Sequence, residues 1–72
     1  MSKQKIQERE LIRQLSTQQG FIQRFFQVLP QYDSSALAYE VVESEHKKLF
    51  GRRRYSGWES FKGIKNRSLR QN

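Results

Sequence analysis

The apolar residues of this chain recur at steps of three, four and seven positions and never alternate with polar residues over the length of a strand. Such steps place side chains on one face of an α-helix, whereas a half-buried strand needs strict alternation. Helical spacing occurs in residues 6–29, 36–50 and 57–70. We therefore predict an all-α fold, a small bundle of three to four short helices.

The length limits how much core the chain can build. At 72 residues it is short for more than one domain, because domains typically run to about 100 residues or more. We expect a single small helical domain over residues 1–72, with residues 71–72 as a disordered tail. A core of this size rarely supplies more than about 3–5 kcal/mol, so a bound partner or dimerisation would add to its stability.

The first helical pattern has a break in its apolar stripe at Gly20. Ser16 and Gln19 have the spacing of a capping box, so one helix would end near Leu15 and another would begin near Thr17. The alternative is one continuous helix, in which the glycine costs only about 1 kcal/mol relative to alanine. We favour two helices.

The second pattern has clear ends. Asp33 or Ser34 can cap a helix over residues 36–50, and Gly51 suits the left-handed residue that closes it. The third pattern follows the sequence Ser56-Gly-Trp-Glu59, which has the form of a capping box. The expected buried residues of the second helix are Ala38, Val42 and Leu49, flanked by Leu37 and Val41, and those of the third are Trp58, Phe61, Ile64 and Leu69.

Glu40, Glu43 and His46 lie within two turns of the second helix. The spacing of Glu43 and His46 matches one half of a helical di-metal carboxylate site. A full site needs a second such motif and further carboxylates, and the chain has only one histidine. We therefore predict a solvated helix face without a metal, on which both residues can be replaced by glutamine.

Catalytic and cofactor-binding patterns are missing from the sequence. There is no cysteine, and the glycines do not form the G-x-G-x-x-G pattern of a dinucleotide site. We predict that the protein is not an enzyme and uses no cofactor. The lack of cysteine fits a reducing compartment, no apolar run approaches the roughly 20 residues of a membrane span, and the N-terminus lacks the apolar stretch of a signal peptide. The predicted location is the cytoplasm.

Positive charge is concentrated at the C-terminal end. The chain has a net charge of +7, and residues 51–72 hold seven basic residues against Glu59 alone. Such a cluster can follow a phosphate backbone, because each neutralised phosphate releases counterions. We predict a nucleic-acid-binding or accessory protein that contacts DNA, in preference to RNA, through residues 51–70. The candidate contact residues are Arg52, Arg53, Arg54, Tyr55, Lys62, Lys65, Arg67 and Arg70. The alternatives are an anionic protein or ribosomal surface as partner, or a solvated basic face.

Aromatic residues are frequent for so short a chain. We expect Phe25, Phe26, Phe50, Trp58 and Phe61 in the core, because rings fill a small core efficiently. Tyr55 lies among arginines, where a ring can stack on a base.

Phe21, Phe25 and Phe26 separate two hypotheses about function. If they close the core, the protein stands alone. If they are exposed, they mark an interface, and the chain is a protein-interaction module whose N-terminal helix pairs with itself, as a homodimer, or with a partner.

Two stretches resemble known families. Ala38-Tyr-Glu-Val-Val-Glu-Ser-Glu-His46, with Phe50-Gly-Arg-Arg-Arg-Tyr-Ser56, resembles a signature of short, uncharacterised bacterial proteins. This resemblance implies a bacterial cytosolic origin and no particular activity.

The second stretch, Arg53-Arg-Tyr-Ser-Gly-Trp-Glu59, is similar to the wing-to-helix segment of winged-helix regulators of the mercury-resistance and excisionase type. That resemblance implies a helix after the R-x-Y-S stretch and a wing arginine, here Arg53 or Arg54, near the DNA backbone. The helix-turn-helix that precedes the wing in those families is not apparent in residues 11–29.

Overall fold

The computed structural model describes residues 8–70, which form four α-helices and one turn of 3-10 helix. The α-helices are α1 (Glu8–Leu15), α2 (Gln18–Val28), α3 (Ser35–Phe50) and α4 (Trp58–Arg70), and the 3-10 turn η1 (Leu29–Gln31) contains Pro30. The described part of the chain contains no strand. The predicted all-α fold is confirmed. The start of the first helical pattern, residues 6–7, and the tail 71–72 lie outside the described residues.

The first helical pattern was compatible with one helix or with two, and the structure contains two. Only Ser16 and Thr17 separate α1 from α2, so the short turn that seemed missing from residues 11–29 is present. The capping residue is Thr17, one position later than predicted: its side chain accepts from the backbone N–H of Gly20 at 3.0 Å. The hydroxyl of Ser16 instead donates to the carbonyl of Arg13.

Helix α3 has the ends that its sequence predicts. The Ser34 side chain accepts from the backbone N–H of Leu37 at 3.0 Å, and Gly51 closes the helix with a φ of 84°. That left-handed conformation is readily available to glycine and costly for residues with a Cβ. The guanidinium of Arg24 in α2 binds both carboxylate oxygens of Glu45 in α3, at 2.8 and 2.9 Å, and so pins the two helices together.

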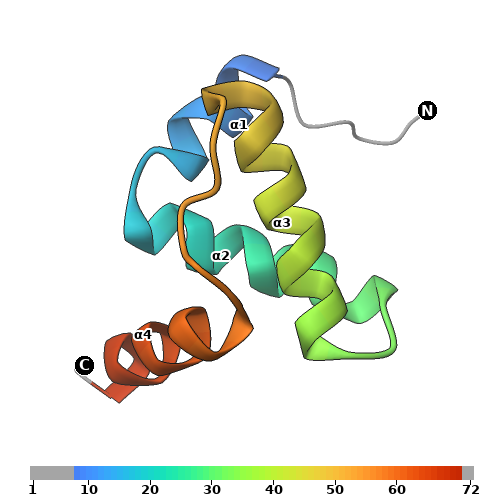
Figure 1. Cartoon of the computed structure of the whole chain (residues 1–72), viewed down its shortest axis with the longest axis vertical. Helices are drawn as coiled ribbons and strands as arrows, with labels where there is room; N and C mark the ends of the chain where they lie inside the picture. Colours follow the sequence, from blue (N-terminus) through green and yellow to red (C-terminus); the bar gives the residue numbers. More distant parts are fainter. Residues whose placement is uncertain (1–7, 71–72) are drawn as a thin grey trace.

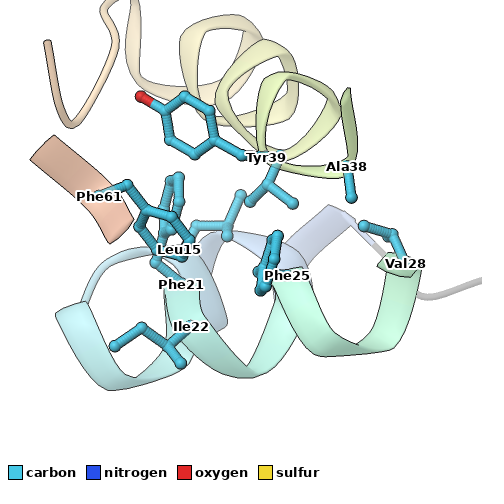
Figure 2. Packing of buried hydrophobic residues seen from close by; sticks show 9 residues of the cluster. Leu15, Phe21, Ile22, Phe25, Val28, Ala38, Tyr39 and Phe61 are labelled. Carbon is cyan, nitrogen blue, oxygen red and sulfur yellow. The ribbon is translucent and has the colours of Figure 1, made fainter. Parts of the chain in front are cut away.

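The core lies where α2 and α3 cross, with α1 and α4 at its sides. Figure 2 shows Tyr39 of α3 reaching toward Phe61 of α4, with Phe21 of α2 nearby. The rings of Tyr39 and Phe61 stack with centroids 5.1 Å apart, a favourable aromatic distance. The buried apolar residues are Leu15, Phe21, Ile22, Phe25, Val28, Ala38, Tyr39, Val42 and Phe61.

Several predicted core positions are wrong. The side chains of Phe26 and Phe50 are 41% and 38% exposed, and Leu37 and Leu69 lie in solvent. Ala38 and Val42 are buried as expected, but the buried face of α3 also includes Tyr39, Glu43 and His46, which its aliphatic periodicity did not suggest. The reason is that α3 packs against the chain that follows it as well as against α2.

Residues 51–57, called the connector below, link α3 to α4. Figure 1 shows the connector running from the C-terminal end of α3 past α2 to α4. As the resemblance to winged-helix regulators implied, a helix follows the R-x-Y-S stretch. The connector itself contains no strand, so it does not form a β wing.

Candidate nucleic-acid interface

A buried carboxylate holds the connector against α3. Glu43 is fully buried, and its side chain accepts from the hydroxyl of Tyr39 at 2.5 Å. It also accepts from the backbone N–H groups of Arg54, at 2.8 Å, and Tyr55, at 2.9 Å. Hydrogen bonds to a charged acceptor are the stronger kind in proteins. The prediction of a solvated face is therefore wrong for Glu43, which joins α3 to the connector.

His46 makes a second attachment one turn further along α3. Its side chain is only 5% exposed, and Nδ1 lies 2.6 Å from the carbonyl oxygen of Arg52. Its ring also packs beside that of Phe50, with centroids 4.5 Å apart. The solvated-face prediction is wrong here too. Glu43 and His46 therefore share one role, which is to anchor the backbone of the connector to α3.

The three consecutive arginines of the connector differ in their contacts. Arg53 donates to both carboxylate oxygens of Glu40, at 3.1 and 3.3 Å, and to the hydroxyl of Tyr39 at 3.3 Å. The hydrogen bond to Glu40 is the main reason that the pKa of Arg53 lies above its ordinary value. Within residues 8–70, the guanidinium groups of Arg52 and Arg54 form no ion pair. These two arginines are the ones available to an external anion.

Tyr55 is more enclosed than a base-stacking residue would be. Its ring meets that of Phe21 edge-on at 5.2 Å and lies 5.6 Å from that of Phe61. Its hydroxyl accepts from Nε of Arg54 at 3.1 Å, and the same guanidinium lies 5.6 Å from the ring centroid. Tyr55 therefore positions Arg54 while its ring supports the core.

The remaining basic candidates are on α4. Lys62 lies 3.6 Å from Glu59, and Lys65 lies 6.0 Å from the ring centroid of Phe26. Arg67 and Arg70 are exposed in the last turns of the helix. The structure thus presents two groups of basic side chains, one on the connector and one along α4.

Sequence reasoning missed the anchoring roles of Glu43 and His46, although a signal was present. Together with Tyr39 and Val42 they recur at steps of three and four, which is the spacing of one buried helix face. Treating only apolar residues as core candidates concealed that stripe.

The hydrogen bond between Tyr39 and Glu43 predicts a measurable response to alkali. Burial, followed by the hydrogen bond to Glu43, raises the pKa of Tyr39 above its ordinary value of 10.0. A raised folded-state pKa contributes stability that is present below about pH 10 and is lost as the pH rises further. We expect Tyr39→Phe to be less stable than the parent near neutral pH, and the difference to shrink above about pH 10.

Urea unfolding of both proteins from about pH 8 to about pH 11 checks this expectation. The lysines and the other tyrosines are common to both chains, so their titration cancels in the difference. A stability difference that stays constant across that range would show that Tyr39 ionises as readily in the folded state as in the unfolded state.

Comparisons of the chain with models of protein families, with curated proteins and with solved structures find no match. Among residues 8–70, no helix has the length and apolar character needed to cross a membrane.

Proposed function

We propose that the protein binds the phosphate backbone of nucleic acid through residues 51–70, and that it binds duplex DNA in preference to RNA. The observation that carries the proposal is the anchoring of the connector. Glu43 and His46 hold the backbone at Arg52, Arg54 and Tyr55, so the arginine side chains project from a fixed base. A fixed base lowers the entropy that side chains lose on binding.

The charge distribution supports the same function. The carboxylates of α3 are occupied inside the molecule: Glu40 pairs with Arg53, Glu45 pairs with Arg24, and Glu43 binds the connector. The charges of Glu40 and Glu45 are therefore offset by Arg53 and Arg24, while Arg52, Arg54, Arg67 and Arg70 form no ion pair within residues 8–70. An excess of positive charge attracts a polyanion over distances of about one Debye length, which is near 10 Å at moderate salt.

The salt dependence of binding tests the proposal. If residues 51–70 neutralise phosphates, the logarithm of the affinity for duplex DNA should fall linearly with the logarithm of the salt concentration, with a slope of about −0.9 per phosphate. Changing Arg52, Arg53 and Arg54 together to glutamine should flatten that slope by about 2 units, because Arg53 is already paired with Glu40. Fluorescence anisotropy with duplex DNA, single-stranded DNA and RNA, from about 50 to about 200 mM salt, gives the slopes.

Arg9 and Arg13, which are exposed on α1, provide the control. Changing both to glutamine should leave the slope close to that of the parent, because the proposal places them outside the contact surface. If the triple variant binds with the parent's affinity and slope, the basic segment is only a solvated surface.

The alternative is a protein-interaction module. Phe21 and Phe25 close the core, and only Phe26 of that cluster is exposed, so the aromatic rings of α2 support this alternative less than they would if all were exposed. It becomes the better hypothesis if the triple variant has no effect on nucleic-acid binding.

A further inference from the structure

Two hollows beside the connector share His46, Arg52 and Arg54 among the residues that line them. One has a volume of about 510 Å³ and the other about 310 Å³, within the usual size range of ligand sites. Their other lining residues are Ser16 and Gln18 from the α1–α2 corner, Phe50 from the end of α3, and Arg53 and Tyr55 from the connector. We call the two together the His46 hollow.

The charge of its lining sets the His46 hollow apart from the two other hollows described. No carboxylate lines it, whereas Glu40 and Glu43 line the hollow near Lys47 and Lys48, and Glu10 lines the one between α1 and α2. Two arginines that line a region without carboxylates, and that form no ion pair within residues 8–70, favour an anion there.

His46 supplies a directed group to this hollow. A carbonyl oxygen only accepts, so the contact with Arg52 requires the hydrogen on Nδ1. Nε2 is then the nitrogen left for a ligand, and it forms no hydrogen bond within residues 8–70. In its protonated form the ring donates from both nitrogens, so Nε2 can donate to an anion while Nδ1 keeps the connector in place.

Hydrogen bonds hold the backbone of both arginines in place. The carbonyl of Arg52 is bound by His46, and the N–H of Arg54 is bound by Glu43. Nε of Arg54 donates to Tyr55 at 3.1 Å, which leaves its two terminal nitrogens for other acceptors. A guanidinium fork of this kind matches the oxygens of a phosphate group.

We propose that the His46 hollow is a phosphate-binding subsite, in which Arg52 and Arg54 bind the phosphate oxygens and Nε2 of His46 donates to one of them. This proposal rests on the proposed function in naming a backbone phosphodiester as the ligand. The same chemistry would accept a free phosphate ion.

The only histidine of the chain makes a direct test. The ¹⁵N signals of its ring report on Nδ1 and Nε2 separately, without any assignment against other histidines. At constant pH we titrate the labelled protein with a short duplex DNA that lacks terminal phosphates and, separately, with inorganic phosphate. We expect the Nε2 signal to move toward its protonated position with the duplex, while Nδ1 changes little.

A matched pair of double variants tests the arginines. Changing Arg52 and Arg54 to glutamine should abolish the Nε2 shift and weaken duplex binding by about tenfold or more at low salt. Changing Lys47 and Lys48 to glutamine removes the same charge from exposed positions at the end of the same helix, and should keep the shift and most of the affinity.

The outcomes separate this proposal from the function on which it rests. A duplex that binds with the expected salt slope but leaves Nε2 unmoved overturns the subsite and leaves the proposed function standing. A shift with inorganic phosphate, together with no binding of the duplex, supports a phosphate site and overturns the proposed function. No shift with either probe, or equal losses in the two double variants, overturns the subsite.

Discussion

Replacing Glu43 with alanine should destabilise the protein by about 3–5 kcal/mol. The carboxylate is fully buried and accepts three hydrogen bonds. Its removal leaves two backbone N–H groups and the hydroxyl of Tyr39 without their acceptor in a region with little access to water. The loss is comparable with the whole stability of a domain of this size, about 3–5 kcal/mol, so we expect a partly or wholly unfolded variant.

Glu40 is the matched control for this change, because it lies one turn earlier on the same helix. Its ion pair with Arg53 is exposed, with 50% of the Glu40 side chain in solvent, and such pairs contribute only about 0–1 kcal/mol. Urea unfolding followed by circular dichroism compares Glu40→Ala with Glu43→Ala. Equal unfolding midpoints for the parent and Glu43→Ala would contradict the anchoring role.

Replacing Gly20 with alanine should be almost as damaging. A Cβ at this position would lie 1.7 Å from the backbone carbonyl oxygen of Gln14 and 2.7 Å from its carbon. Overpacking a core typically costs about 1–3 kcal/mol, and we expect at least the upper end of that range, because a backbone yields less readily than a side chain. The variant has to open the turn between α1 and α2, which exposes Leu15.

Gly63 offers the opposite result from the same substitution. It lies within α4, and apart from its chain neighbours and the backbone of its own helix no atom is within 4 Å of the position that its Cβ would take. Alanine is better than glycine inside a helix by about 1 kcal/mol, so Gly63→Ala should raise the melting temperature while Gly20→Ala lowers it. Thermal unfolding measures both. A rise for Gly20→Ala would refute the close approach of α1 and α2, and a fall for Gly63→Ala would refute the open position within α4.

The positions of the helices were predictable because their causes are local. Ser34 caps α3, Gly51 ends it, and Pro30 lies just beyond α2. Each acts within one or two turns of itself, through a missing N–H, a free side-chain oxygen or a backbone angle. The cap of α2 was misplaced by one residue, since Ser16 and Thr17 both carry a suitable hydroxyl and only the path of the turn decides between them.

The burial of individual side chains depends instead on contacts between residues distant in sequence. Whether Glu43 and His46 meet water depends on where the connector passes, and that path depends on α4 docking Phe61 against Tyr39 and Phe21.

The aromatic residues show the same division. That the chain forms short helices rich in aromatic rings could be predicted from the sequence, because helical spacing and caps act between neighbours along the chain. Packing determines that Phe25 is buried while Phe26 is exposed, and that Arg53 pairs with Glu40 while Arg52 and Arg54 line a hollow. These differences arise from packing between residues distant in sequence, and spacing along one helix carries no information about its neighbours.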